Sequence, residues 1–219
     1  MIPTLKENVL KIAKEKDICK KLPEDAYSKM KYPKVLPMMH FAVDQYELEH
    51  FGHLMVMHTT TKMGMELLTL SFCPQRGLLM PYLLVDAMSM KKKKCVFVEF
   101  YGCGQEDLND EPLYMYHERL DNLEDYQEKP AWYIAERKPY SLIKTGEETE
   151  LRIMAEAGVA SYLELAKGAV ESPEYLKKLA AFRERMITEG NPASKTLEML
   201  LKKDGAEKFM REVVMPLDV

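Results

Sequence analysis

The sequence has little of what marks secreted, membrane or metal-binding proteins. It carries four cysteines without a Cys-x-x-Cys pair, and no segment approaches the roughly 20 apolar residues that cross a membrane. A disulfide framework, a zinc site and an iron–sulfur cluster are therefore not expected, and we assign no metal ligand. Lysines interrupt the N-terminal segment, which argues against a secretory signal and indicates a cytoplasmic protein without a membrane partner.

Glycine-rich cofactor motifs are also missing. Gly102 and Gly104 are the closest pair of glycines, and an acidic segment follows them instead of the apolar helix start that a dinucleotide site requires. We therefore expect no nicotinamide or flavin dinucleotide. If the protein catalyses a reduction, its electrons should come from another protein. The formal net charge of -4 argues against binding of nucleic acid through a general basic field.

The chain does contain enough apolar residues for one core. At 219 residues and 47% hydrophobic, a single domain over residues 1–219 is predicted. After Thr4, a candidate N-cap, apolar residues recur at helical spacing to about residue 20. Short apolar or alternating runs follow, joined by brief turns that suit antiparallel hairpins. The predicted strands cover residues 39–48, 53–60, 65–72, 82–88 and 95–101.

The second half of the chain has mainly helical patterns. Helices are predicted over residues 107–127, 151–167, 173–188, 194–203 and 206–214, with a brief strand at 140–143. Ser172 and Ser194 are predicted N-caps. A sheet built early and covered by helices from both ends of the chain predicts an α+β fold. Its simplest form is a three-layer α/β/α sandwich with a central antiparallel sheet.

One carboxylate interrupts an apolar strand. Asp86 follows Leu83, Leu84 and Val85, and burial of an unpaired charge in such a strand is costly. Two interpretations remain open. Asp86 is either a proton-transfer group with a raised pKa, or a strand-end carboxylate that pairs with a lysine or caps a turn.

Three separated segments, residues 66–86, 129–134 and 191–214, resemble those of one family. The first contains a strand, a Pro-containing turn and a strand that ends in Asp86; the second contains Pro-Ala-Trp; the third has the order and spacing of the family's closing helices. Together they resemble the ferredoxin-dependent bilin reductases. The resemblance implies reduction of a linear tetrapyrrole such as biliverdin, with Asp86 as proton donor. It also implies no bound cofactor and a reduced ferredoxin or flavodoxin as electron source.

The sequence differs from that family at other ionisable positions. Met55 and Met57 stand in place of a His and a Glu, and Thr69 stands in place of a second His. The family's register implies that these three residues face the same pocket as Asp86, because alternate strand residues share a face. Their replacement keeps open a non-catalytic bilin or heme carrier on the same fold, with a Met sulfur or His53 as axial ligand of heme.

Three more residues are assigned to ligand binding, each with a structural alternative. His53 faces the pocket unless the register slips by one residue, which would bring in His58 instead. Arg76 lies in a predicted turn and would pair with a tetrapyrrole propionate, or else be exposed to solvent. Asn191, followed by Pro192, stands where the family has an Asn-Asp pair.

A run of lysines joins two predicted strands. Lys91, Lys92, Lys93 and Lys94 form either a solvated turn or a docking site for an acidic electron carrier. Docking of that kind would be fast and sensitive to salt. A monomer is expected.

Overall fold

The computed structural model describes residues 1–90, 93–105, 108 and 110–217. Its α-helices are α1 (Ile2–Lys16), α2 (Glu111–Leu120), α3 (Glu148–Leu165), α4 (Pro173–Thr188) and α5 (Ser194–Phe209). Shorter helical turns are η1 (Trp132–Glu136), η2 (Ala166–Gly168) and the π-helical η3 (Met210–Val214). The strands are β1 (Cys19–Lys21), β2 (Lys29–Tyr32), β3 (Met39–Leu48), β4 (Gly52–Thr61), β5 (Met65–Pro74), β6 (Tyr82–Met90), β7 (Lys93–Tyr101), β8 (Glu124–Asp125) and β9 (Leu142–Thr145).

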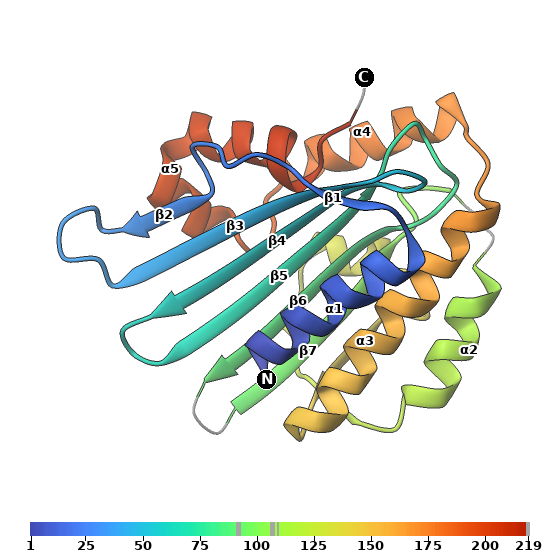
Figure 1. Ribbon diagram of the computed structural model, residues 1–219, viewed down its shortest axis with the longest axis horizontal. Coiled ribbons are helices and arrows are strands. Elements are labelled where there is room, and N and C mark those ends of the chain that lie inside the picture. The colour runs from blue at the N-terminus through green and yellow to red at the C-terminus, as the bar shows by residue number, and fades with distance from the viewer. Residues whose placement is uncertain (91–92, 106–107, 109, 218–219) are drawn as a thin grey trace.

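The strands form one open antiparallel sheet in the order β1-β3-β4-β5-β6-β7-β9-β8, with β2 also paired to β3 (Figure 1). The long central strands β3 to β7 are consecutive in sequence, so hairpins join them. This is the meander that the short predicted connections favour, and the predicted strand ranges lie within or close to the observed ones.

Helices cover both faces of this sheet. One face packs against α1, α2 and α3 through a core that includes Leu54, Val56, Leu70 and Val85. The other face packs against α4, α5 and η3 through Met55, Leu84 and their neighbours. Figure 1 shows α1 and α3 in front of the sheet, with α4 and α5 on its other side. The predicted α+β, three-layer α/β/α sandwich is confirmed.

The observed ends of the helices differ more from the predicted ends than those of the strands do. The first helix begins at Ile2, and Thr4 is therefore inside it and does not cap it. The helix expected over 107–127 is reduced to α2, with the short strand β8 after it. Ser172 does cap α4, since its Oγ accepts a hydrogen bond from the Tyr175 N–H at 3.3 Å.

The C-terminal helical segment bends. Lys202 has a φ of 63° inside α5, a left-handed conformation that interrupts the helix near the end of the predicted range 194–203. Ser194 is the first residue of α5 and not its cap, and its Oγ accepts a hydrogen bond from the Asn191 N–H at 2.8 Å. The bend turns the end of α5 and η3 back onto the sheet, where they form part of a cavity wall.

No helix within the described part of the chain is both long and apolar enough to cross a membrane.

Candidate functional site

A cavity lies between the middle of the sheet and the chain that connects α4, α5 and η3. The side chains that line it from the sheet alternate along β4, β5 and β6, because every second residue of a strand faces the same side. The sheet wall consists of Met55, Met57, Thr69, Tyr82, Leu84 and Asp86. The helical wall consists of Met186, Asn191, Pro192, Ala193, Leu197, Phe209, Met210 and Val214. The structure thus brings together most of the residues that the sequence assigned to a ligand site.

Asp86 lies at the centre of the sheet wall. It is opposite Thr69 on β5 and Phe97 on β7, and the Thr69 hydroxyl donates a hydrogen bond of 2.5 Å to its Oδ1. Burial among apolar side chains raises the pKa of Asp86 to about 6, while the hydrogen bond from Thr69 lowers it. No lysine pairs with this carboxyl among the described ion pairs, so the lysine-paired interpretation of Asp86 is not supported.

The remainder of the sheet wall is apolar and rich in sulfur. Met55 and Met57 are buried beside Asp86, and the described lining residues contain no other carboxylate and no histidine. Tyr82 is also buried in the wall, and its hydroxyl lies 2.9 Å from Ser71 Oγ. Because Ser71 donates its only hydroxyl hydrogen to the Val214 carbonyl at 2.6 Å, Tyr82 is the donor to Ser71. The bond from Ser71 to Val214 links η3 to the sheet, and the bond from Tyr82 joins β6 to the same serine.

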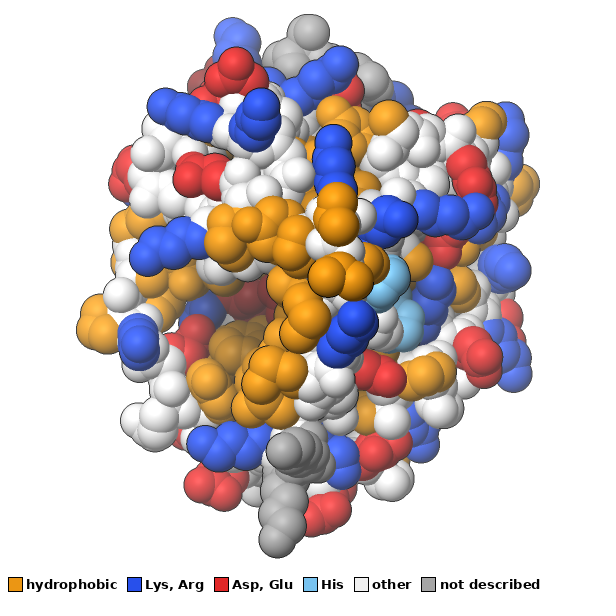
Figure 2. Space-filling model, turned by 90° about the vertical axis from the view of Figure 1, so that its left-hand side faces the viewer, with side chains coloured by type: hydrophobic (Ala, Val, Ile, Leu, Met, Phe, Trp, Pro, Cys, Tyr) orange, Lys and Arg blue, Asp and Glu red, His pale blue; other side chains and the backbone are white. Residues whose placement is uncertain are grey.

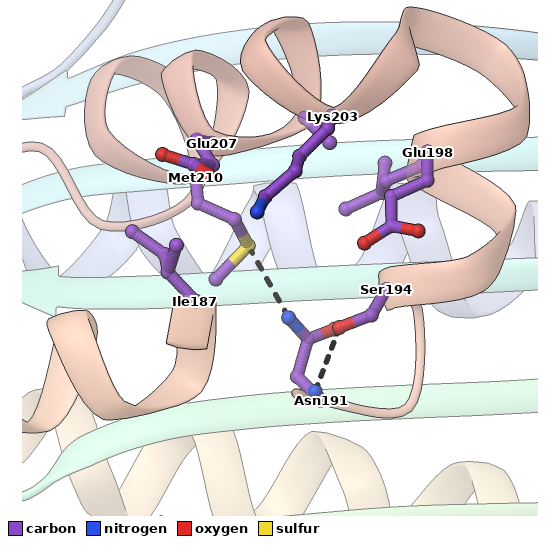
Figure 3. Close-up of a pocket in the computed structure, with 9 residues that line it drawn as sticks. Ile187, Asn191, Ser194, Glu198, Lys203, Glu207 and Met210 are labelled. Atoms are coloured by element: carbon purple, nitrogen blue, oxygen red, sulfur yellow. Dashed lines mark hydrogen bonds between the residues drawn. The ribbon is translucent and has the colours of Figure 1, made fainter. Parts of the chain in front are cut away.

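Asn191 is in the helical wall, but its polar atoms are used by its own turn. Its Oδ1 accepts from the Ala193 N–H at 2.9 Å, and its Nδ2 donates to the Met186 carbonyl at 3.1 Å. Figure 3 shows this turn from a smaller neighbouring pocket, with dashed lines from Asn191 to Ser194 and to the Met210 sulfur. In this arrangement Asn191 shapes the wall and offers no free amide group to a ligand.

The enclosed space is small. It holds about 50 Å³, whereas pockets for small organic ligands usually hold about 300–1,000 Å³. Figure 2 views the molecule from the left-hand side of Figure 1 and shows a hollow whose rim is largely hydrophobic, with acidic side chains visible inside.

His53 is not in the cavity wall. It lies on the same face of β4 as Met55 and Met57, is 4% exposed, and has its Nε2 3.1 Å from Gln45 Oε1. Its Nδ1 is buried without a hydrogen-bond partner, and burial lowers the pKa of His53 to about 4. The ring is therefore neutral at physiological pH. His58 points to the opposite face, near Glu66, so the expected register holds without a slip.

Arg76 lies outside the cavity. It occupies the turn between β5 and β6, where its Nε donates to Glu171 Oε1 at 2.8 Å. The Gly77 carbonyl in the same turn accepts from the Ser172 N–H at 2.8 Å, which fixes this turn against the start of α4. A strand pattern does not determine where a turn side chain points, and the assignment of Arg76 to a propionate is therefore not supported by its position.

The lysine run falls partly outside the described residues, since these do not include Lys91 and Lys92. Lys93 is exposed at the start of β7. Lys94 is half-buried, and its Nζ lies 3.5 Å from Glu148 Oε2 at the start of α3. Lys93 is thus open to a partner, whereas Lys94 also has a structural contact.

Glu99 is a buried carboxyl that was not predicted from the sequence. This carboxyl is 1% exposed on β7 and faces the same side of the sheet as Asp86. It accepts hydrogen bonds from Tyr101 at 2.6 Å and from Arg137 at 2.7 Å. Glu99 does follow the apolar residues Val96, Phe97 and Val98, a signal of the same kind as the one that drew attention to Asp86. Its partner Arg137 is distant in sequence and could not be found from a local pattern.

No family model and no curated protein sequence matches this chain. Its fold is similar to that of phytochromobilin synthase from tomato, whose crystal structure is in complex with biliverdin. The TM-score is 0.78, and the match covers 98% of this chain and 82% of that chain at 13% sequence identity. The two proteins therefore share a fold, while so low an identity leaves their activities to be compared by experiment.

Proposed function

We propose that the protein binds a linear tetrapyrrole in the cavity and that Asp86 transfers a proton to the pigment during its reduction. One observation carries this proposal. A carboxyl with a pKa of about 6 lies in the wall of an apolar cavity, on a fold that it shares with an enzyme crystallised with biliverdin. The chain as a whole would then act as a single bilin-reductase-like domain.

The chemistry needs a proton source beside the pigment. A conjugated tetrapyrrole accepts single electrons more readily once it is protonated, because the proton cancels the charge that each electron adds. An acid with a pKa near the working pH can both give a proton and recover one. At pH 7 a group with a pKa of about 6 is protonated about a tenth of the time. Reduction of one double bond takes two electrons and two protons, so Asp86 has to be reprotonated or a second donor has to act.

The size of the cavity requires part of its wall to move. A tetrapyrrole does not fit into about 50 Å³, so binding has to displace residues 191–197 and η3 from the sheet. The contact that has to open is mainly apolar, through Leu197, Phe209 and Met210, with the Ser71–Val214 hydrogen bond as its polar part. The bend at Lys202 gives this wall a natural point at which to change its angle.

Electrons would come from a reduced ferredoxin or flavodoxin, with no cofactor bound to this chain. Such carriers are acidic proteins, and the lysine run at the β6–β7 connection has the opposite charge. Lys93 is exposed at this point. As part of the proposal, this supports docking at the end of β6, which carries Asp86, and of its neighbour β7.

A second candidate is a non-catalytic bilin or heme carrier. It is favoured by Met55 and Met57, since the described cavity wall offers a ligand sulfur atoms and apolar surface but only one ionisable carboxyl. For heme, a methionine sulfur would be the axial ligand, because His53 does not line the cavity. The described residues contain no group of three or more His, Cys, Asp or Glu placed to hold a metal ion.

An absorbance titration tests the proposal. Biliverdin added to micromolar protein should give a sharpened or red-shifted band, because an enclosed site fixes one conformer of a flexible pigment. Heme serves as the comparison ligand. A spectral change with heme alone would favour the carrier, and unchanged spectra with both pigments would contradict both candidates.

A further inference from the structure

A second buried carboxyl, which the reaction described above does not use, lies beside Asp86. Glu99 is on β7, and its side chain is 2% exposed. Its Oε1 accepts hydrogen bonds from the Tyr101 hydroxyl at 2.6 Å and from Arg137 Nε at 2.7 Å, and Arg137 Nη2 also lies 2.5 Å from Oε1. Among the described hydrogen bonds, none reaches the other oxygen, Oε2. A proton on this carboxyl would therefore be carried by Oε2.

Arg137 contacts two carboxyls in different ways. Its Nη1 and Nη2 donate to separate oxygens of Glu128, at 2.5 and 2.8 Å, which is the two-bond geometry of an ionised pair. Toward Glu99 it directs Nε and Nη2 to a single oxygen. A protonated carboxyl accepts in this way, because its carbonyl oxygen takes the hydrogen bonds while its other oxygen carries the hydrogen. The contacts fit an ionised Glu128 and a protonated Glu99.

The charges of the cluster agree with this assignment. Arg137 supplies one positive charge from a side chain that is 7% exposed, and Glu128 balances it from a side chain that is 22% exposed. An ionised Glu99 would add a buried negative charge that nothing in this cluster balances, which is costly. Burial raises the pKa of Glu99 to about 7, while Arg137 lowers it and Asp86 raises it.

The register of the sheet places Glu99 close to Asp86. Asp86 pairs with Phe97 and Leu84 pairs with Glu99, so the two carboxyls are diagonal neighbours on one face of β6 and β7. Diagonal neighbours lie about 7–8 Å apart at their Cα atoms, within reach of long side chains. Proton transfer between two such groups takes place directly or through one water molecule.

We propose that Glu99 stores a second proton on Oε2 and passes it to Asp86 after Asp86 has protonated the pigment. The use of this proton rests on the proposed function, whereas its position on Glu99 is a property of the protein without pigment. At pH 7 a group with a pKa of about 7 is protonated about half of the time, against about a tenth for Asp86. Glu99 is thus the better store, and Asp86 is the group that lines the cavity.

This transfer completes the balance of the reduction. Two reduced one-electron carriers are oxidised, and one double bond of the pigment gains two electrons and two protons. Asp86 gives the first proton and is left ionised. The Oε2–H bond of Glu99 then breaks as an O–H bond forms on Asp86, which gives this second proton to the pigment. Glu99 is left as a carboxylate held by Arg137 and Tyr101, and a proton from water restores it.

The other titratable groups that face Glu99 are neutral tyrosines. Burial raises the pKa of each, on β7, β6 and η1 respectively: Tyr101, Tyr82 and Tyr133. From α4, the uncharged ring of Phe182 packs on Tyr101. The charged groups at Glu99 among the described residues are thus Arg137 with its partner Glu128, and Asp86 when it is ionised.

Infrared spectroscopy of the protein without pigment tests where the proton is. At pH 6 ordinary aspartates and glutamates are ionised, so the C=O band of protonated carboxyls comes from groups with a raised pKa. We expect such a band in the unchanged protein and in Asp86→Asn, and its loss as the pH rises through 7. Glu99→Gln should remove this component. Glu66→Gln, a glutamate on the opposite face of the sheet, is the matched control and should leave the band unchanged.

A folded Glu99→Gln protein with the same protonated-carboxyl band as the unchanged protein would overturn the inference. If that variant does not fold, ¹³C labelling of the glutamate carboxyls in the unchanged protein replaces it. Among the described glutamates, Glu99 is the one with a raised pKa, so part of the band at pH 6 should shift with this label. A band that does not respond to the glutamate label would also overturn the inference.

Single-turnover reduction of bound biliverdin tests the use of the proton. In Glu99→Gln the first proton-coupled step should keep its rate within about twofold, and the second should slow by about tenfold or more. Equal rates of the second step in the two proteins would overturn the role of Glu99 as a supply. An unchanged protein that shows the infrared band but does not reduce biliverdin would contradict the proposed function and leave the proton on Glu99 in place.

Discussion

Replacing Asp86 by asparagine should make the protein more stable at alkaline pH. An aspartate carboxyl that is fully exposed to water has a pKa of 3.8, and burial raises the pKa of Asp86 to about 6 in the folded protein. The folded state therefore binds the proton more tightly than the unfolded state does, and ionisation of Asp86 destabilises the fold. This penalty is absent below pH 3.8, grows as the pH rises to 6, and is constant above it.

The size of the effect follows from the shift. About two pKa units correspond to roughly 3 kcal/mol in the free energy of unfolding, and this is an upper value because Asp86 is only partly buried. Asparagine has nearly the same shape, carries no charge and can still accept the hydrogen bond from Thr69. Asp86→Asn should therefore raise the free energy of unfolding by about 1–3 kcal/mol at pH 8, and by less than about 1 kcal/mol at pH 4.

Urea denaturation of both proteins at the two pH values measures this difference. Thr69→Val is the companion variant, because loss of the Thr69 hydrogen bond removes a contact that favours the ionised carboxylate. Thr69→Val should lower the free energy of unfolding at pH 8 and change it less at pH 4. If Asp86→Asn is less stable than the unchanged protein at pH 8, the carboxylate is stabilised by a partner in the fold, and the reasoning about its burial is refuted.

Three other changes test separate parts of the account. Burial lowers the pKa of His53 to about 4, so stability should fall by up to about 3 kcal/mol as the pH drops from 6.5 to 4. His53→Gln should flatten this decline in urea titrations, and an unchanged decline would exclude His53 as its source. Ala193→Trp fills the cavity and should weaken biliverdin binding by about tenfold or more in an absorbance titration, while equal affinity would place the pigment elsewhere. Replacing Lys91–Lys94 by glutamate should slow ferredoxin-driven turnover at low ionic strength and flatten its salt dependence without changing pigment binding. An unaltered salt dependence would place the docking site on another surface.

The strands of the sheet could be predicted from the sequence because strand alternation is a local property. The register between strands is not local, and the placement of Thr69, Met55 and Met57 on the face of Asp86 was predicted from the family resemblance. The short strands β1 and β2 were missed, since β1 is mostly polar and the alternation of β2, Lys-Met-Lys-Tyr, is only four residues long.

Features that depend on distant contacts could not be predicted. The pairing of Glu99 with Arg137 joins residues 38 apart, and the turn of Arg76 is held by the start of α4. The bend at Lys202 places a lysine in a left-handed conformation that its sequence does not favour. Each of these is decided by the packing of one element on another.

One measurement tests the central claim most directly: the anaerobic loss of biliverdin absorbance driven by reduced ferredoxin, compared between the unchanged protein and Asp86→Asn. The account predicts that both bind the pigment with the same spectrum, and that the variant turns over at least about 100-fold more slowly because the proton donor is gone. Equal rates in the two proteins would contradict the role of Asp86, and the absence of turnover in the unchanged protein would contradict the proposed reaction.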